Sequence, residues 1–269
     1  MNFLVDGNWY LHRAYSIAGQ VDPKDAVAKL FVSLICKDAL ATRSKKLFVG
    51  FDGSDIFRYK LYKKYKANRS EGSGEQTDNL IYKISMPHVQ NILNMIGISW
   101  LQEPEYEADD LLVSTSKLDG TFILGAQDKD YYQALNKRVQ MYCSVGNARY
   151  ITVKDCKAKF GLPPKKMVMY QSLIGDSIDN IPQILSPAKA KQLCLEYDSL
   201  QDVEDPELKE FLLVNKARIQ RNKKLVKLVT NVPGIPTSLK SDAHRKWSLA
   251  PRSLVNYVAF VNPKTKSLF

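Results

Sequence analysis

The chain has 269 residues, of which 45% are hydrophobic; this is enough to bury the core of one large domain, or of a domain with a smaller appendage, and argues against disorder of the whole chain. Lys and Arg number 39 against 28 Asp and Glu, so the formal net charge of +11 favours an acidic partner such as nucleic acid or anionic lipid. The four cysteines lie far apart without companion histidines, and no window approaches the roughly 18 apolar residues of a membrane span, so we expect neither structural zinc nor a membrane helix.

Short apolar runs typical of strands alternate with longer helix-like segments in the first half of the chain. The strand-like runs cover residues 2–5, 46–51, 98–101 and 121–126, and the helix-like segments cover residues 25–41, 81–96 and 108–116. This alternation predicts an α/β fold with a mostly parallel central sheet flanked by helices. Helix patterns dominate from Pro163 onward. We therefore expect an α/β core over residues 1–160 and a helical region over residues 161–269.

A basic, tyrosine-containing segment follows the second predicted strand. Residues 58–69 read RYKLYKKYKANR, in which six Lys or Arg residues alternate with three Tyr, and residues 70–78 contain no apolar side chain. Such a composition predicts an exposed excursion from the sheet rather than a further core element.

Acidic residues stand at the ends of three predicted strands and beside two predicted helices. After strands they are Asp6 in FLVD, Asp52 in LFVGFD, and Asp128 and Asp130 in FILGAQDKD. Beside helices they are Glu107, Asp109 and Asp110 in EYEADD, and Asp176 and Asp179 in GDSIDN. Because the functional crevice of an open α/β sheet lies at the carboxyl ends of its strands, we expect all nine acids to converge there.

Nine carboxylates in one crevice would repel one another strongly unless protons or bound cations neutralised them. Ligation by oxygen alone suits Mg²⁺ or Mn²⁺ better than zinc, and two such ions can activate water and stabilise both oxygens of a phosphodiester undergoing displacement. Taken singly, each acid is more often a helix cap, a turn residue or a solvated surface charge than a metal ligand. Without these nine, 19 acids face 39 bases, so the rest of the chain carries about +20 and suits a polyanion.

Six motifs in this order resemble the 5′ nuclease superfamily, which includes flap endonucleases, bacteriophage 5′→3′ exonucleases and RNase H-type enzymes, and the 5′ nuclease domain of bacterial DNA polymerase I. The motifs are VDG at Asp6, FDG at Asp52, YKANR at residues 65–69, EADD at residues 107–110, QDKD ending at Asp130, and GDSIDNIP ending at Pro182. The resemblance extends over nearly the whole chain.

The resemblance implies two metal positions. One would be held by Asp6, Asp52, Glu107 and Asp109, with Asp110 adjacent, and the other by Asp128, Asp130, Asp176 and Asp179. We expect two Mg²⁺ ions, with Mn²⁺ as a substitute.

The resemblance also implies that residues 58–80 form a helical arch or clamp through which single-stranded 5′ ends pass. Lys66 and Arg69 occupy its motif positions and are the expected catalytic cations, because a positive charge near the scissile phosphate stabilises the charge that develops in the transition state. The expected nucleic-acid contacts are Arg58, Lys63, Lys64 and Tyr65, with Tyr62 and Tyr65 as stacking candidates. The alternative is a solvated charge run whose tyrosines pack on the sheet.

The family's glycine-rich hairpin, which grips duplex phosphates and often holds K⁺, is replaced here by the glycine-free QILSPAKAKQL. We expect this loop to follow a different path, and the sequence does not support a K⁺ site. Ser186 as N-cap before Pro187 would still begin a helix whose free N–H groups face a phosphate, with Lys189 and Lys191 nearby. An ordinary capped helix with solvated lysines is the alternative. The resemblance implies that this helical region is a DNA-binding region of the helix-hairpin-helix type.

These features predict a metal-dependent, structure-selective 5′ nuclease acting on DNA, and on RNA primers, at 5′ ends, flaps or nicks. Its expected partners are duplex DNA with a 5′ single-stranded end, flap or nick, RNA–DNA hybrids and replication proteins, with no membrane contact and a monomeric chain. Because MNFLVDG carries no secretion signal, we expect it in the cytoplasm of a bacterium or a phage-infected host. The alternatives are a PIN-type RNase, which is shorter and lacks GDxxDN, and a catalytically silent DNA-junction binder on the same fold.

Overall fold

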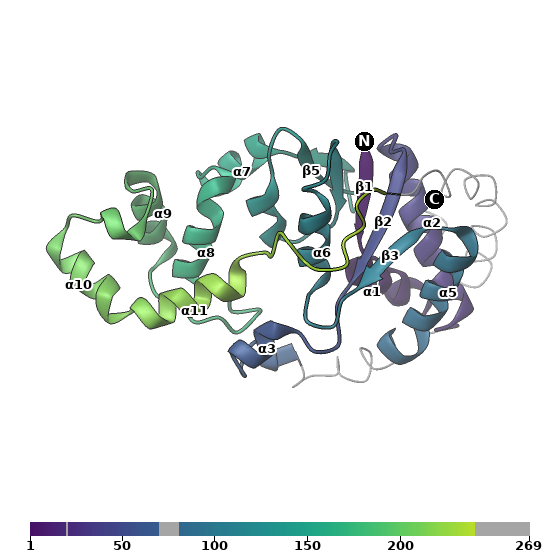
Figure 1. The fold of residues 1–269 in the computed structure, drawn as a ribbon, viewed down its shortest axis with the longest axis horizontal. Coiled ribbons are helices and arrows are strands. Elements are labelled where there is room, and N and C mark those ends of the chain that lie inside the picture. Colours follow the sequence, from purple (N-terminus) through teal and green to yellow (C-terminus); the bar gives the residue numbers. More distant parts are fainter. Residues whose placement is uncertain (20, 70–80, 240–269) are drawn as a thin grey trace.

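The computed structural model describes residues 1–19, 21–69 and 81–239, which form an α/β sheet domain extended on one side by helices (Figure 1). The strands are β1 (Asn2–Asp6), β2 (Lys46–Phe51), β3 (Ser99–Gln102), β4 (Phe122–Gly125), β5 (Val139–Cys143) and β6 (Arg149–Ile151). They form one sheet in the order β3-β2-β1-β4-β5-β6, in which the first five strands are parallel and β6 is antiparallel to β5. The predicted fold class is confirmed.

The central strand β1 contributes to two hydrophobic clusters, one on each face of the sheet. Phe3 and Val5 belong to one cluster and Leu4 to the other, and all three are fully buried. Successive side chains of a strand point to opposite faces, so a continuous apolar run such as FLV suits a parallel sheet that helices cover on both faces.

Helices close both faces of the sheet. The cluster around Phe3 packs against α1 (Gly7–Ala18), α2 (Asp25–Ala41), the short π-helix η2 (Ile81–Ser85) and α5 (Met86–Ile96). The cluster around Leu4 packs against α6 (Ala108–Thr115), the 3₁₀ helix η3 (Asp130–Ala134), α7 (Val153–Phe160) and α8 (Met167–Ile174). No helix within the described ranges has the length and apolar character needed to cross a membrane.

The helical region beyond α7 continues the core of the sheet. After η4 (Pro164–Lys166) and α8 come α9 (Pro187–Glu196), η5 (Leu200–Asp202), α10 (Pro206–Val214) and α11 (Lys216–Val226), which lie to one side of the sheet in Figure 1. Leu193 of α9 and Leu212 of α10 belong to the same cluster as Leu4. The expected boundary at residue 160 therefore falls at the end of α7, and apolar packing continues across it.

The segment predicted to form an arch is described over residues 58–69 only. It contains the short helix α3 (Phe57–Leu61), a turn, and the 3₁₀ helix η1 (Ala67–Arg69). The rest of the predicted arch, residues 70–80, lies outside the described residues.

The connection between α8 and α9, residues 175–186, contains one glycine, Gly175, directly after α8. Its positive-φ positions are Gly175 (φ 66°) and Asn180 (φ 59°), and no residue from 181 to 186 has a positive φ. The backbone N–H groups of Ile184 and Leu185 both donate to the carbonyl of Leu173, at 2.8 and 3.0 Å, which folds the loop back onto α8. The part of the connection after Asn180 therefore closes without a positive φ, whereas its first residue, Gly175, adopts a conformation that favours glycine.

Asn222 of α11 joins three segments of the helical region. Its amide is fully buried and donates to the carbonyls of Ser172 in α8 and Pro182, at 3.1 and 2.8 Å. We expect Asn222→Ala to lower the free energy of unfolding by about 1–3 kcal/mol, because two buried carbonyls lose their donor. Gln220→Ala, exposed on the same helix, is the matched control and should change it by less than about 0.5 kcal/mol in urea titrations. Equal effects of the two changes would contradict the bridging role.

Candidate functional site

The acidic residues lie along the edge of the sheet formed by the carboxyl ends of its parallel strands. Asp6 ends β1, Asp52 follows β2, and Asp128 comes shortly after β4. Because β1 pairs in parallel with both β2 and β4, these three ends lie side by side. Chain connections also diverge at this point of the strand order, which is where open α/β sheets form their crevice.

Asp6 serves both the fold and the candidate site. One of its oxygens caps α1 by accepting the N–H of Trp9 at 3.0 Å, and the other accepts the hydroxyl of Tyr131 at 3.0 Å. Burial, reinforced by the negative charges of Asp52 and Asp128, raises the pKa of Asp6 to about 7. A carboxylate that resists ionisation in this way gains from a nearby cation.

Asp52 attaches the start of α6 to the end of β2. Its carboxylate accepts the N–H of Ala108 at 2.7 Å, and its own N–H donates to the side-chain oxygen of Asn8 at 2.9 Å. This contact places the EADD motif beside the sheet edge. Backbone hydrogen bonds from Gly53 to Tyr106 and from Asp55 to Pro104, both 2.8 Å, join the same two segments.

The EADD motif forms a three-carboxylate cluster at the start of α6. Glu107 is the N-cap and Asp110 completes a capping box with it, while oxygens of Glu107, Asp109 and Asp110 lie within 4.8 Å of one another. Asp109 Oδ1 is buried and has no hydrogen-bond partner among the described residues. Burial, followed by the charges of Asp110 and Glu107, raises the pKa of Asp109 well above its ordinary value. A buried carboxylate oxygen without a donor suits a cation ligand.

The structure corrects the expectation that Arg58 contacts nucleic acid. Its side chain is 1% exposed, and its guanidinium donates to both oxygens of Asp110, at 2.5 and 2.8 Å, and to Glu107 at 2.9 Å. The same group donates to the carbonyls of Leu225 and Lys227 at the end of α11, at 2.8 and 3.2 Å. Arg58 therefore neutralises the acidic cluster from inside the protein. Asp110, expected as a ligand adjacent to the first metal, has both oxygens engaged by Arg58.

Tyr65 and Lys66 both contact Glu107. The Tyr65 hydroxyl donates to Glu107 at 3.1 Å, and the Lys66 ammonium makes an ion pair with it. Although burial opposes ionisation, Lys66 and Arg58 hold the pKa of Glu107 below its ordinary value. Because Tyr65 is 4% exposed, the structure corrects its assignment as a base-stacking or phosphate contact. Lys66 does lie at the acidic cluster, as the motif implied.

The other residues of the basic segment divide into exposed and packed groups. Lys63 and Lys64 are exposed, so their expected phosphate contacts remain predictions. Tyr62 packs in a small cluster with Ile181, and the Arg221 guanidinium lies 4.3 Å from the centre of its ring. The side chain of Arg69 lies outside the described residues, and its expected catalytic role stays a prediction.

The YKANR and GDSIDN motifs dock directly onto each other. Lys66 N–H donates to the carbonyl of Asp179 at 3.0 Å, Asn180 donates to the carbonyl of Lys64 at 2.9 Å, and Asn68 donates to the carbonyl of Ser177 at 3.0 Å. Lys66 adopts a left-handed backbone conformation here, with φ 54°. The helical region thus fixes the backbone from which the Lys66 side chain reaches Glu107.

The second acidic group contains two partners that sequence reasoning missed, Lys129 and Gln171. Lys129 makes an ion pair with Asp176 at 2.7 Å, and the Gln171 amide donates to Asp130. Burial, reinforced by the charges of Asp128 and Asp179, raises the pKa of Asp130 to about 8. The position of Lys129 between the two acids of QDKD was the available signal that a cation lies in this group, although its ion-pair partner is Asp176. Gln171 carried no signal, because a Gln inside a helix pattern is usually exposed.

Acids of both groups lie close enough together to act on the same titratable side chains. The charges of Asp6, Asp109 and Asp128 all raise the pKa of Tyr131, and those of Glu107, Asp179 and Asp109 raise the pKa of Tyr65, after burial in both cases. Asp176 in turn acts on Asp130. The structure therefore brings the acids of all five motifs to one edge.

Carboxylate oxygens dominate this edge, and they are the ligands that hard divalent cations prefer. The excess of negative charge, the raised pKa values of Asp6 and Asp130, and the unpartnered Asp109 oxygen all fit a bound divalent metal. The three cations found here, Arg58, Lys66 and Lys129, offset only part of the acidic charge.

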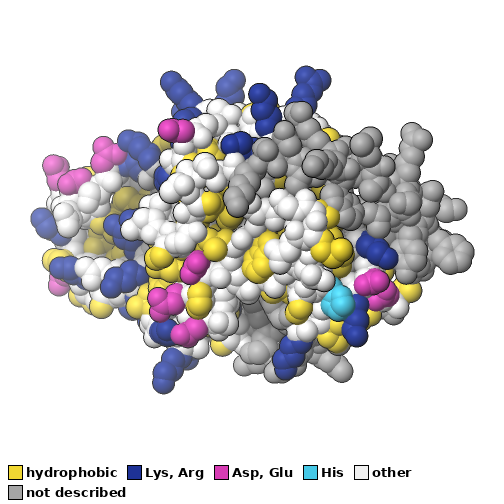
Figure 2. All heavy atoms as spheres, turned by 45° about the vertical axis from the view of Figure 1, so that its right-hand side comes forward, with side chains coloured by type: hydrophobic (Ala, Val, Ile, Leu, Met, Phe, Trp, Pro, Cys, Tyr) yellow, Lys and Arg dark blue, Asp and Glu magenta, His cyan; other side chains and the backbone are white. Residues whose placement is uncertain are grey.

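Ser186 is the N-cap of α9, as predicted, and Pro187 lies in the first turn. The side-chain oxygen of Ser186 accepts the N–H of Lys189 at 3.4 Å. Lys189 is exposed, whereas the half-buried Lys191 lies with its ammonium beside Gly161 at the end of α7. This position of the Lys191 ammonium complements the dipole of α7. Contacts from Ser186, Lys189 and Lys191 to a duplex stay predictions. On the face drawn in Figure 2, Lys and Arg side chains lie at many separate places on the surface.

Comparison with known proteins identifies related sequences. A family model described as the 5′-3′ exonuclease, N-terminal resolvase-like domain matches residues 1–161. The chain is 30% identical over 259 residues to DNA polymerase I of Rhizobium leguminosarum, covering 86% of this chain but 25% of the polymerase. It is 28% identical over 248 residues to a 5′-3′ exonuclease of Aquifex aeolicus, covering 86% of this chain and 82% of that protein. This chain therefore spans a quarter of the polymerase and most of the exonuclease.

Solved structures share the fold at low sequence identity. The bacteriophage T5 D15 flap endonuclease, in a pseudo-enzyme–product complex with DNA and metal ions, superposes with a TM-score of 0.70 at 17% identity, over 96% of this chain and 97% of that one. Human GEN1 in complex with Holliday junction DNA gives 0.56 at 13% identity, over 97% of this chain and 71% of that one. The resemblance inferred from the motifs is confirmed at the level of fold.

The raised pKa values of Asp6 and Asp130 predict that stabilisation by metal depends on pH. The pKa of an unfolded Asp is about 3.9. Below that pH, protonated Asp6 and Asp130 stabilise the metal-free fold fully. This stabilisation is lost as pH rises through their folded-state pKa values of about 7 and about 8. A divalent cation requires both groups ionised, so the rise in melting temperature caused by Mg²⁺ or Mn²⁺, relative to EDTA, should be larger at pH 8.5 than at pH 6.

The matched control for this measurement is Asp6→Asn with Asp130→Asn, in which neither side chain can titrate. Most of the pH dependence should disappear in this double variant. A metal-induced shift in melting temperature that is the same at both pH values in the unchanged protein would refute the assignment.

Proposed function

The chain belongs to the family of 5′-3′ exonuclease N-terminal resolvase-like domains, and from this premise we propose that it is a divalent-metal-dependent nuclease that hydrolyses phosphodiester bonds of DNA at 5′ ends, flaps or nicks. The observation that carries the proposal is the convergence of the acids of five motifs, together with Lys66, at one edge of the sheet. The activity stated in the names of the Aquifex aeolicus exonuclease and the T5 flap endonuclease agrees with it.

We assign the first metal to Asp6, Asp52, Glu107 and Asp109, and the second to Asp128, Asp130, Asp176 and Asp179. Mg²⁺ is the proposed ion in both positions, with Mn²⁺ as a substitute, because every donor is a carboxylate. Bound there, two such ions would activate water and stabilise the attacking and leaving oxygens of the phosphodiester. Asp110 holds Arg58 in this assignment and orients the cluster without contacting the metal.

The protein's own contribution is to keep these carboxylates close together before substrate arrives. Asp52 is held by the N–H of Ala108, Asp6 by Tyr131, and Asp130 by Gln171. Each of these contacts orients one carboxylate through a buried or half-buried partner, as is typical of residues behind metal ligands. Pre-organisation of this kind lowers the reorganisation needed during the reaction.

Lys66 is the proposed electrophilic residue. Its side chain is 15% exposed and pairs with Glu107. The ammonium is therefore already held at the acidic edge before a substrate phosphate binds. From this position the ammonium would be able to reach a phosphate bound at the acidic edge, where it would stabilise developing negative charge. Arg69 is proposed as a second cation on the ground of its motif position alone.

Duplex and single-stranded contacts are proposed for the exposed basic residues around this edge. Lys63 and Lys64 stand on the segment that precedes Lys66, and Ser186 with Lys189 marks the free N-terminus of α9. We include RNA primers paired with DNA among the substrates, and we place the enzyme in the cytoplasm as a monomer that acts beside replication proteins. Phosphate contacts would make its affinity fall steeply with salt.

Cleavage of end-labelled flap, nicked and RNA-primed duplexes with Mg²⁺ tests the proposed function. We expect products released from the 5′ end, no cleavage in EDTA, and loss of at least about a hundredfold in rate for Asp128→Ala or Asp130→Ala, with duplex binding retained, because the second metal loses a ligand. Asp198→Ala, an exposed acid remote from the cluster, is the control and should cleave normally. Cleavage from 3′ ends, or undiminished cleavage by both variants, would overturn the assignment.

Lys66→Ala separates catalysis from binding. We expect the single-turnover rate to fall by about 10²–10³-fold while the Kd for flap DNA changes little, because the ammonium acts on charge that appears only in the transition state. Lys63→Ala, exposed three residues earlier, serves as the matched control and should alter affinity more than rate. If Lys66→Ala weakens binding without slowing the single-turnover step, Lys66 is a phosphate contact instead.

A further inference from the structure

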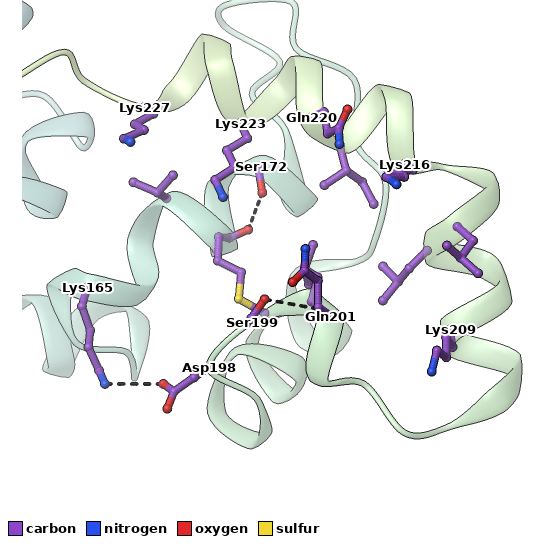
Figure 3. Close-up of a pocket in the computed structure, with 16 residues that line it drawn as sticks. Lys165, Ser172, Asp198, Ser199, Gln201, Lys209, Lys216, Gln220, Lys223 and Lys227 are labelled. Carbon is purple, nitrogen blue, oxygen red and sulfur yellow. Dashed lines mark hydrogen bonds and ion pairs between the residues drawn. The ribbon is translucent and has the colours of Figure 1, made fainter.

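A groove of about 690 Å³ lies in the helical region, among α8, α10, α11 and the segment around η5. Figure 3 shows its labelled lysines: Lys216, Lys223 and Lys227 come from α11 and the residue after it, Lys209 from α10, and Lys165 from η4. None of the nine acids of the candidate nuclease site lines it. The groove therefore needs an explanation of its own, independent of the proposed nuclease function.

The rim of the groove is strongly cationic. Asp198 is its single acidic lining residue, and this carboxylate is already paired with Lys166 at 2.7 Å and Lys165 at 3.5 Å. The remaining rim lysines are exposed and have no ion-pair partner within the part of the chain that the structure describes: Lys209, Lys216, Lys223 and Lys227. An acidic occupant would satisfy them.

The floor of the groove is apolar. Val168 and Met169 of α8 and Leu212 and Ile219 of the two covering helices line it. At its mouth, Leu213 is 62% exposed, which leaves a large apolar side chain in water beside the lysines. A volume of this size, in the range of about 300–1,000 Å³ that is usual for binding pockets, accommodates a few apolar side chains.

The combination of floor and rim favours a peptide over a nucleic acid. No lining residue is aromatic, whereas single-stranded bases bind by stacking on aromatic rings. A duplex backbone would use the lysines and leave the apolar floor unfilled. An amphipathic peptide fits both features, because its apolar side chains enter the groove at helical spacing while its carboxylates meet the rim.

We propose that this groove, between α8, α10 and α11, binds an acidic amphipathic segment of a partner protein, in which Asp or Glu residues flank large apolar side chains. The chain's own C-terminal residues 240–269 have the wrong charge, with six Lys or Arg against one Asp. The occupant is therefore a different protein, and the groove is a docking surface that adjoins the candidate nuclease site through α8 and α11.

Selection from a phage-displayed library of random 12-residue peptides, followed by fluorescence anisotropy with the enriched peptides, tests this proposal. We expect the enriched peptides to contain several Asp or Glu residues together with Leu, Ile or Phe. Binding to Lys216→Glu/Lys223→Glu should be at least about tenfold weaker than to the unchanged protein, since two rim cations become anions. Arg218→Glu/Lys224→Glu is the matched control: it has the same charge change on exposed positions of α11 outside the groove, and should bind normally.

A second pair of variants tests the apolar contact at the mouth of the groove without changing charge. Leu213→Ser should weaken the peptide several-fold, whereas Val214→Ser, 80% exposed and outside the groove, should not. Because both side chains are exposed, both variants should fold, so this pair keeps the test decisive even if the charge-reversed protein is unstable.

Three results would overturn the proposal. The first is that no acidic–apolar peptide is enriched, and the second is that the groove variants bind the peptides as well as their controls do. The third is that a (dT)₂₀ oligonucleotide displaces the peptides and loses affinity for Lys216→Glu/Lys223→Glu but not for Arg218→Glu/Lys224→Glu, which would make the groove a nucleic-acid site. Flap cleavage by the groove variants should equal that of the controls, which separates failure of docking from failure of the nuclease.

Discussion

Repulsion among carboxylates at the carboxyl edge of the sheet is the constraint that the rest of the structure accommodates. The acids lie close enough to raise one another's pKa, as Asp52 does for Asp6 and Asp128 does for Asp130. Without offsetting charge, such an edge would favour opening of the loops that carry it. The protein supplies three cations, Arg58 and Lys66 from the basic segment and Lys129 from the QDKD motif, and leaves the remaining charge for bound metal.

Arg58 is the most deeply buried of these cations, and it connects two regions of the chain. On one side it binds Asp110 and Glu107 at the start of α6, and on the other it binds the carbonyls of Leu225 and Lys227 at the end of α11. Removing one partner of a buried ion pair costs about 3–5 kcal/mol, although the intact pair adds little net stability. Arg58 therefore specifies how the helical region is seated on the acidic cluster more than it adds to the stability of the fold.

The segment after α11 completes this attachment by hydrogen bonds to side chains of the core. Val229 N–H donates to Asp110 at 2.7 Å, and Leu228 N–H donates to Gln133 at 3.0 Å. The helical region is thus attached to the acidic edge at two places, through the segment after α11 and through the hydrogen bonds between YKANR and GDSIDN. The second group of acids thus depends on the same packing that holds Lys66 in place.

Charge is divided between two surfaces of different use. Acids lie together at the sheet edge, where metal is proposed to bind, whereas exposed lysines surround the apolar floor of the groove beside α11. Attraction between exposed charges is screened beyond about 10 Å at 0.1 M salt. The acidic edge and the lysine-lined groove can therefore each attract a partner of opposite charge. A basic chain of net charge +11 can in this way keep a strongly acidic site.

The sequence by itself determined the elements whose signal is local. Residues 25–41 and 46–51 were predicted with the bounds that the structure has, because a long helical apolar pattern and a continuous apolar run each identify their element without reference to the rest of the chain. The acids and Lys66 were also found from sequence, since strand ends and motif order place them at one edge. The short strands β5 and β6 were not predicted, because they exist through pairing with β4 and with each other rather than through propensity.

Only the tertiary structure decided what the basic and aromatic residues of the site do. Sequence could not distinguish a lysine or arginine that faces solvent from one that neutralises a buried acid, so Arg58 was expected to contact nucleic acid and Lys129 was overlooked. Tyr65 was expected to stack on bases for the same reason, whereas it is buried with its hydroxyl on Glu107. The role of a charged side chain depends on which carboxylates lie within a few ångströms of it, and long-range packing between α6, α11 and the YKANR segment sets those distances.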